Sequence, residues 1–135
     1  MPMDGPKVAV GAVIIEKNKV LLVKRKNPPA QGEWAIPGGK VRWGETLREA
    51  LKREMKEELN VEIRPEGLVK VVEIMPENGN PNFHYVILDY RATIIGGKPQ
   101  AGDDALQAAW FGKDELAQAL LTPSTRRLLR EILGP

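Results

Sequence analysis

The first third of the chain has a β-type pattern of apolar residues, followed by a loop. Apolar and β-branched side chains fill residues 8–16 and 20–26, and the polar Lys-Asn-Lys sequence at 17–19 separates these two segments. Two apolar runs joined by so short a polar segment are typical of a β-hairpin. Residues 27–40 are rich in proline and glycine, which predicts a loop.

Helical spacing of apolar residues begins after this loop. It predicts a helix over 46–59, with Glu45 or Thr46 at an N-terminus that favours acids and capping side chains. The last helix is expected to open at Thr122-Pro123-Ser124 and to close at Gly134. The remaining predicted elements are strands at 68–75, 83–95 and 108–111, and helices at 113–121 and 124–132.

This order of elements predicts the fold class. Strands, a helix, more strands and terminal helices are typical of an α/β protein whose mixed sheet is covered by helices on both faces. A chain of 135 residues can bury one substantial core but not two, and no repeat, low-complexity segment or linker divides it. We therefore expect a single domain over residues 1–135.

The helix predicted at 46–59 has an unusual acidic face. With about 100° of rotation per residue, Glu57 and Glu58 fall about 60° and 40° to either side of Glu54. Leu47 and Leu51 lie on the same side of the helix, so the carboxylates continue the stripe that should face the core. Crowded carboxylates repel one another, and acids near a helix C-terminus oppose the helix dipole.

A positive partner is therefore expected on this face. Mg²⁺ is a good candidate, because it binds a few carboxylates and shares its other positions between water and substrate phosphates. The alternative is an ordinary solvated helix, in which Arg48, Lys52 and Lys56 on the opposite side pair with Glu49 and other acids.

Composition excludes several other kinds of site. The chain has no cysteine, so disulfides, a thiol nucleophile and a zinc-thiolate site are impossible. Its 20 Lys and Arg residues nearly balance 18 acids, which gives no support to nucleic-acid binding. The polar first residues do not form a signal pattern, and no apolar run is long enough to span a membrane. We expect a cytoplasmic protein without nucleic-acid or membrane partners.

A specific spacing surrounds the acidic face. Behind the turn signal Pro37-Gly38-Gly39, the chain places Glu45, Arg53-Glu54, Glu57-Glu58 and Asn60-Val61 at fixed intervals over residues 39–61. This spacing resembles the Nudix box. Asn60 stands where the family has glycine, and asparagine is the next best residue for ending a helix in the left-handed conformation. The resemblance extends loosely over the whole chain and implies an α/β/α sandwich.

The resemblance also implies roles for these residues. Glu54, Glu57 and Glu58, joined by the carbonyl of Gly39, would hold Mg²⁺ or Mn²⁺. Arg53 would brace Glu45 with its planar guanidinium and so fix the glycine loop against the helix.

The general base is left open. A carboxylate that is not fully committed to metal, Glu54 or Glu57, could take the proton from water. In many relatives the base comes instead from a loop after the sheet, which points to Asp103 or Asp104, with Asp104 as our prediction. The alternative for both aspartates is capping of a local turn.

Substrate contacts are predicted from the same resemblance. Lys24 or Arg25 would bind a substrate phosphate, and strand alternation allows only one of them to face the site; both could instead be surface residues. Trp34 would stack on a base or ribose, with core packing as the alternative. Exposure of Trp43 would indicate a partner or dimer surface.

Within the family, three segments look most like the ADP-ribose pyrophosphatase-like members: Gly-Asp-Asp-Ala at 102–105, residues 84–90 and Leu-Thr-Pro at 121–123. The function implied is metal-dependent hydrolysis of ADP-ribose to AMP and ribose 5-phosphate, by a homodimer acting on a small nucleotide. One alternative is a pyrophosphohydrolase of nucleoside triphosphates, including oxidised ones. The other is a non-catalytic nucleotide sensor.

Overall fold

The computed structural model describes residues 5–27, 30–76, 83–102 and 105–134, in which the chain forms eight strands and three helices. None of these helices is both long and apolar enough to cross a bilayer. In chain order the elements are β1 (Lys7–Val13), β2 (Ile15–Glu16), β3 (Lys19–Arg25), β4 (Trp34–Ala35), β5 (Gly38–Lys40), α1 (Leu47–Leu59), β6 (Glu62–Ile74), β7 (Tyr85–Gly96), β8 (Ala105–Phe111), α2 (Lys113–Gln118) and α3 (Pro123–Leu133).

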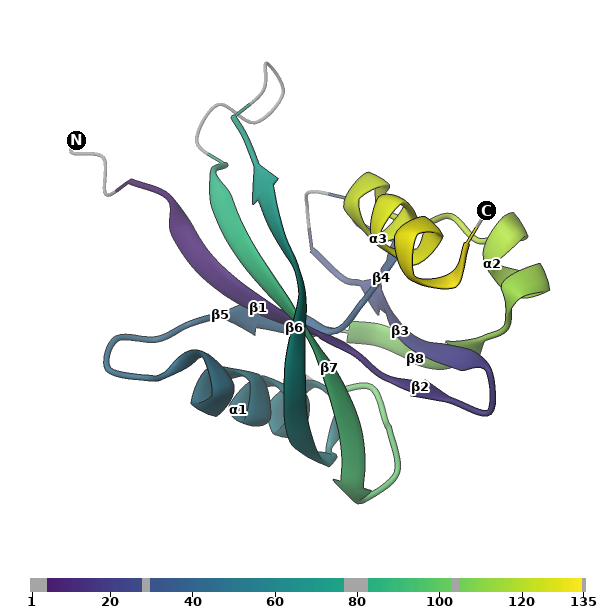
Figure 1. Ribbon diagram of the computed structural model, residues 1–135, viewed down its shortest axis with the longest axis horizontal. Helices are drawn as coiled ribbons and strands as arrows, with labels where there is room; N and C mark the ends of the chain where they lie inside the picture. The colour runs from purple at the N-terminus through teal and green to yellow at the C-terminus, as the bar shows by residue number, and fades with distance from the viewer. Residues whose placement is uncertain (1–4, 28–29, 77–82, 103–104, 135) are drawn as a thin grey trace.

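The strands form two four-stranded sheets (Figure 1). The first has the order β5-β1-β7-β6 and is mixed, because β1 and β7 are parallel while β1–β5 and β6–β7 are antiparallel. The second has the order β2-β3-β4, with β8 antiparallel to β3. Helix α1 lies against the first sheet, and α2 and α3 lie on the other side of the molecule. This is the predicted mixed sheet flanked by helices.

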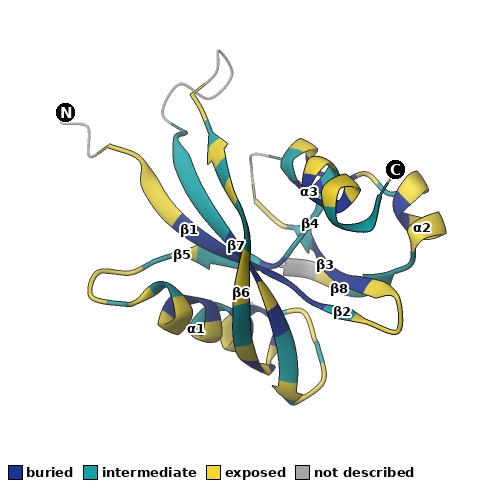
Figure 2. Ribbon diagram, viewed as in Figure 1, coloured by how far each residue is buried: buried dark blue, intermediate teal, exposed yellow. Residues whose placement is uncertain are grey.

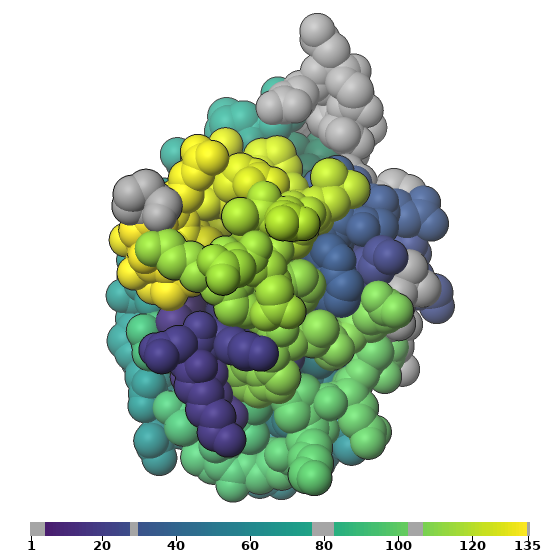
Figure 3. Space-filling view, turned by 90° about the vertical axis from the view of Figure 1, so that its right-hand side faces the viewer, coloured from purple at the N-terminus to yellow at the C-terminus, as the bar shows by residue number. Residues whose placement is uncertain are grey.

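Each helical layer has its own core (Figure 2). The core under α1 takes alternate residues of β1, β3 and β7, and the helix contributes Ala50, Leu51, Met55 and Leu59, each fully buried. The second core joins Val20 and Leu22 of β3 to residues of α2 and α3, which lie over the upper and central part of the face seen in Figure 3. Burying one such aliphatic side chain contributes about 1.5–3 kcal/mol.

Local signals define the ends of α1. Thr46 accepts a hydrogen bond from the backbone of Glu49 at 3.1 Å, and Glu49 accepts one from the backbone of Thr46 at 2.8 Å, which forms a capping box. The helix ends at Asn60, whose φ of 58° lies in the left-handed region. Both ends agree with the sequence prediction.

The hairpin between β2 and β3 is also confirmed. Lys17 and Asn18 have φ of 51° and 63°, so both turn residues are left-handed, as a two-residue hairpin turn of the mirror-image type requires. This turn lies at the lower edge of the face shown in Figure 3.

Several predicted boundaries were wrong. Strand β8 begins at Ala105 rather than at residue 108, and α2 ends at Gln118 rather than at residue 121. The loop predicted at 27–40 contains the short strands β4 and β5, which are defined by pairing with β3 and β1 rather than by their own composition. Strand β6 begins at Glu62 rather than at residue 68, although it contains Pro65 and Gly67. The β6–β7 pairing shifts register around these residues, and bulges on an edge strand are where proline and glycine are tolerated.

One buried carboxyl group lies outside both cores. Asp89 of β7 is 3% exposed, and its Oδ1 is buried without a hydrogen-bond partner among the described residues. It lies beside Gly11 of β1, where an added Cβ would come within 2.4 Å of that oxygen. Burial raises the pKa of Asp89 from 3.8 to about 6, and the nearby Lys70 only partly opposes this shift.

We predict that Asp89 makes the protein less stable as the pH rises. Because its pKa is higher in the native than in the unfolded chain, its stabilisation is complete below pH 4 and is lost as the pH rises through about 6. Asp89→Asn should remove this dependence and raise the free energy of unfolding at pH 8 by about 3 kcal/mol, the equivalent of the shift. Urea titrations at pH 4 and pH 8 measure both effects. Glu73→Gln, at an exposed carboxylate of β6, is the control, and equal pH dependence in the two variants would contradict the prediction.

Candidate active site

Arg53 of α1 joins the helix to strand β5 and to Glu45 in the segment that follows it. Its Nε and Nη2 donate to the two carboxylate oxygens of Glu45 at 2.6 and 2.9 Å, and Nη2 also donates to the carbonyl of Lys40 at 2.9 Å. The contact expected between Arg53 and Glu45 is therefore present and bidentate. It lowers the pKa of Glu45 to about 2, helped by the backbone N–H of Arg42, which donates to the same carboxylate.

The remaining nitrogen of Arg53 faces the acidic residues of α1. Nη1 donates to Glu54 at 2.8 Å and to Glu57 at 3.2 Å, so two carboxylates share one guanidinium nitrogen. The pKa of Glu54 is raised, mainly by burial and further by the charge of Glu57, while Arg53 opposes the shift. The pKa of Arg53 is raised in turn by its hydrogen bond to Glu45.

Glu58 lies on the same face but has a different partner. It is buried, and its Oε1 accepts a hydrogen bond from the backbone N–H of Gly38 at 3.0 Å. The helix therefore holds β5 from two sides, through Arg53 at Lys40 and through Glu58 at Gly38. The turn predicted at Pro37-Gly38-Gly39 was wrong, because Gly38 and Gly39 are extended and pair with β1.

The two glycines of β5, Gly38 and Gly39, are needed for different reasons. A Cβ on Gly38 would lie 2.1 Å from the carbonyl oxygen of Val10 in β1. A Cβ on Gly39 would lie 2.2–2.4 Å from the carboxylate atoms of Glu54. Only glycine lets the backbone approach the neighbouring strand and the carboxylate so closely.

The acidic residues fit a hard divalent cation in chemistry and in place. Their donors are carboxylate oxygens, they lie around Arg53 and strand β5, and Gly39 of that strand lets the carboxylate of Glu54 lie directly against the backbone. Among the described residues, however, no three acidic or histidine side chains form a ready metal-binding group. Arg53 and Gly38 hold the carboxylates instead, so the cage predicted from Glu54, Glu57 and Glu58 is not assembled in this arrangement.

The predicted base on the loop after the sheet cannot be placed, because Asp103 and Asp104 lie outside the described residues. Gly102, the residue before them, donates its N–H to the carbonyl of Glu58 at 2.6 Å, and a Cβ there would lie 2.2 Å from the carbonyl of Glu57. Gly102 therefore packs against the last turn of α1.

The two predicted phosphate contacts lie on opposite faces of β3. Val23 belongs to the core under α1, whereas Leu22 belongs to the core under α2 and α3. Strand alternation then puts Arg25 on the α1 side and Lys24 on the other side. Both side chains are half-buried, and Arg25 is the better placed of the two for a contact near α1.

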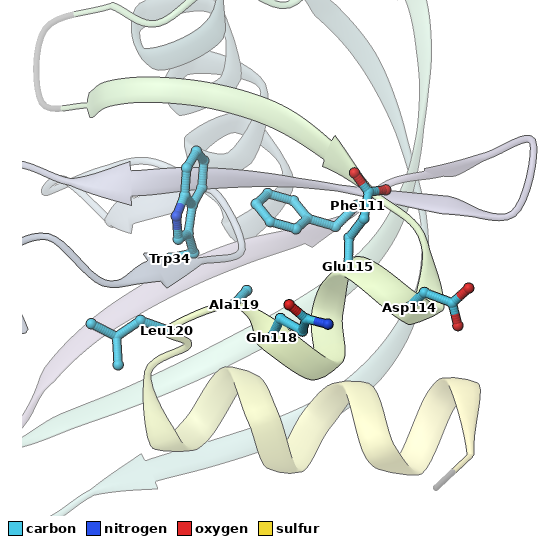
Figure 4. A pocket seen from close by; sticks show the side chains of 7 residues that line it. All are labelled: Trp34, Phe111, Asp114, Glu115, Gln118, Ala119 and Leu120. Carbon is cyan, nitrogen blue, oxygen red and sulfur yellow. The ribbon is translucent and has the colours of Figure 1, made fainter.

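Trp34 packs on sheet residues at a different part of the molecule. Its ring lies edge-on to that of Phe111, with 4.8 Å between the centroids, and the backbone N–H of Trp34 donates to the carbonyl of Leu120 at 2.8 Å. Both rings line an open depression of about 600 Å³ (Figure 4), whose other residues are Asp114, Glu115, Gln118, Ala119 and Leu120. These contacts are those of the packing alternative, and a base or ribose contact for Trp34 stays a prediction.

Arg42 is a site residue that the sequence did not reveal. Its Nη2 lies 3.6 Å from Glu57 Oε1, and its backbone N–H donates to Glu45 at 2.8 Å. An exposed arginine in a loop gives no local signal of either contact, although its position three residues before Glu45 could have suggested a turn closed by that carboxylate.

Comparison with known proteins identifies the family. A family model for the NUDIX domain matches residues 5–132. The chain belongs to the Nudix family. The resemblance drawn from the spacing of the Nudix box is thereby confirmed, and the crystal structure of a MutT Nudix hydrolase from Burkholderia pseudomallei agrees in fold. That structure superposes with a TM-score of 0.85 at 34% identity, covering 96% of this chain and 99% of the other.

Curated Nudix relatives have different named activities. An ADP-ribose pyrophosphatase from Methanocaldococcus jannaschii is 41% identical over 82% of this chain. The human 8-oxo-dGDP phosphatase NUDT18 is 32% identical over 84% of this chain. A putative 8-oxo-dGTP diphosphatase 2 from Mycobacterium tuberculosis is 32% identical over 93% of this chain and 87% of its own length. The chain spans 64% of the length of the archaeal protein and 34% of the human one.

Proposed function

We propose that this Nudix chain is a metal-dependent pyrophosphohydrolase that cleaves a nucleoside diphosphate linked to another group. The observation that carries the proposal is the arrangement around Arg53. It holds Glu54 and Glu57 beside Gly39 of β5, which approaches Glu54 without a side chain. A diphosphate bound through metal ions fits such a surface, because the carboxylates can supply oxygen ligands to the metal and the glycine backbone can come close to it.

The metal would be Mg²⁺ or Mn²⁺, held by Glu54, Glu57 and Glu58 with the carbonyl of Gly39. Bound there, it would neutralise phosphate charge and lower the pKa of a water molecule that attacks phosphorus. Holding it requires Glu54 and Glu57 to turn from Arg53 toward the ion. Glu57 can do so most easily, because its side chain is 40% exposed.

Other residues of the proposed site would position these groups, accept a proton or contact the substrate. Arg53 would act as a positioning residue that keeps Glu45 and strand β5 fixed against α1. Glu54 or Glu57 would accept the proton of the attacking water, with Asp104 as the candidate from the neighbouring loop. Arg25 or Lys24 would contact a substrate phosphate.

ADP-ribose is the proposed substrate, with AMP and ribose 5-phosphate as products. The archaeal relative named for this activity supports it, being 41% identical over 111 residues. The alternative substrates are nucleoside triphosphates, including oxidised ones, and the relatives named for 8-oxo-dGDP and 8-oxo-dGTP support this second activity. The residues of the box act on the diphosphate and do not choose between these substrates.

A substrate panel tests the proposal. Purified protein is incubated with Mg²⁺ and ADP-ribose, diadenosine polyphosphates or nucleoside triphosphates, and the products are separated by chromatography. We expect ADP-ribose to be cleaved fastest. Since loss of groups that only support metal ligands costs 10–100-fold, Glu57→Gln should lower the rate by about a hundredfold or more. Lys56→Ala, at an exposed neighbour on α1, is the control.

Two outcomes of the panel would contradict the proposal. Binding of nucleotides without turnover of any substrate would favour the sensor function. Equal rates for the wild type and Glu57→Gln would show that these carboxylates do not hold the metal.

The proposal includes location and assembly. We infer a cytoplasmic homodimer that acts on a small nucleotide and not on nucleic acid or membranes. Leu68, Val71 and Met75 support an interface, because these apolar residues on or beside the edge strand β6 are at least half exposed. Sedimentation equilibrium should give twice the mass of the chain, and a monomer at all concentrations would contradict this part.

A further inference from the structure

Trp43 is an aromatic side chain left entirely in water. Its exposed fraction is 103%, and it is the one aromatic residue among the exposed large apolar residues of the described chain. The other two tryptophans, Trp34 and Trp110, are partly buried against the cores. An exposed indole forgoes the large stabilisation of burial, so a binding role is a reasonable explanation for its position.

The backbone that presents Trp43 forms a hydrogen-bonded turn. Glu45 donates its N–H to the carbonyl of Arg42 at 3.0 Å, and Gly44 between them has a φ of +85°. Trp43 thus occupies the second position of a tight turn whose third residue needs the left-handed region. The side chain of Glu45 closes the turn again by accepting the N–H of Arg42 at 2.8 Å.

The same turn is fixed relative to the acidic face of α1. Arg53 holds Glu45 through two hydrogen bonds, and Arg42 lies 3.6 Å from Glu57. The backbone of Trp43 is therefore held close to the acidic residues that we assign to the metal, and its exposed indole starts from a point beside the proposed site.

The charges around Trp43 indicate the kind of ligand. Arg42 and Lys40, one and three residues before it, are exposed cations on the same short segment. An aromatic ring flanked by exposed cations suits a ligand that carries both a flat ring and negative charge. A nucleotide has both, whereas an apolar protein surface would have no use for the cations.

We propose that Trp43 is a stacking platform for the nucleobase of the substrate, with the phosphates lying beside Arg42 and over the proposed metal site of α1. This inference rests on the proposed function, and it adds a specificity residue outside the metal site. Base–aromatic stacking is tolerant of base identity, so Trp43 would favour nucleotides over base-free diphosphates rather than one base over another.

Calorimetric titrations with ADP and with inorganic pyrophosphate, both with Mg²⁺, test the proposal. Trp43→Ala should weaken ADP binding by about tenfold and leave pyrophosphate binding unchanged, because only ADP carries a base. Trp43→Phe should restore most of the ADP affinity. Ile95→Ala, at an apolar residue of β7 that is 58% exposed, is the matched control.

The outcomes separate the two proposals. Unchanged ADP affinity in Trp43→Ala, or equal weakening of ADP and pyrophosphate, would overturn the stacking role while the proposed function stood. A change in sedimentation with unchanged ADP affinity would also overturn it and would make Trp43 a self-association residue. Failure of the wild type to bind either probe would contradict the proposed function itself.

Discussion

Replacing Arg53 by alanine is expected to lower the rate of diphosphate hydrolysis by about a hundredfold or more, the effect of a small misplacement of catalytic groups. Arg53 is the one contact that Glu45, Glu54 and Glu57 have in common. Without it, Glu45 and Glu54 would lose their ion pair with Arg53, Glu57 would keep only the one with Arg42, and the carbonyl of Lys40 would lose its donor on α1. Strand β5 and the acidic face of α1 would no longer be held in a fixed relative position.

The size and kind of this effect can be separated from simple unfolding. Arg53→Lys keeps the charge but cannot donate two parallel hydrogen bonds to Glu45, so we expect it to recover only part of the rate. Lys52→Ala, at an exposed residue of the same helix, should behave like the wild type. Rates are measured over a range of Mg²⁺ concentrations beside urea unfolding of each variant.

A positioning role predicts a lower kcat at saturating Mg²⁺ in a protein that is still folded. An Arg53→Ala variant that hydrolyses substrate at close to the wild-type rate would remove Arg53 from the account.

The second large effect is expected at the paired glycines, and it should differ between them. Gly38→Ala should lower the free energy of unfolding by about 3 kcal/mol, because the new Cβ would overlap the backbone of β1 and neither strand can move away cheaply. Gly39→Ala meets only the end of the Glu54 side chain, which can rotate. Its unfolding free energy should change by less than about 1.5 kcal/mol.

Activity should show a different pattern from stability. Gly39→Ala should reduce hydrolysis strongly in a folded protein, because the displaced carboxylate is one of the proposed metal ligands. Urea titration and hydrolysis rates of the two variants give the comparison. If both variants lost stability equally, or if Gly39→Ala kept full activity, the close approach of Gly39 to Glu54 would have no functional meaning.

The sequence predicted best what depends on neighbouring residues. Thr46 and Asn60 defined both ends of α1, because capping and the left-handed ending are local properties. Strands β4 and β5 were missed, because short segments around prolines and glycines become strands only through pairing with distant β3 and β1. The early start of β6 was missed for the same reason, since its bulges against β7 absorb Pro65 and Gly67.

The site shows the same division. Helical periodicity placed Glu54, Glu57 and Glu58 on one face, but it could not show that Gly38 binds Glu58 while Arg53 holds the other two. The contact between Arg42 and Glu57 depends on how the turn at Trp43 folds back over α1. Asp89 could have been noticed as a carboxylate within an apolar strand, but its lack of a partner depends on Gly11 of the neighbouring strand.

Direct measurement of bound Mn²⁺ tests the central assignment, that the carboxylates of α1 hold a divalent cation. The electron paramagnetic resonance signal of free Mn²⁺ is followed as wild type, Glu54→Gln, Glu57→Gln and the control Lys56→Ala are added. We predict saturable binding by the wild type and Lys56→Ala, and affinity at least about tenfold weaker in each glutamine variant. Equal Mn²⁺ binding by all four proteins would contradict the assignment.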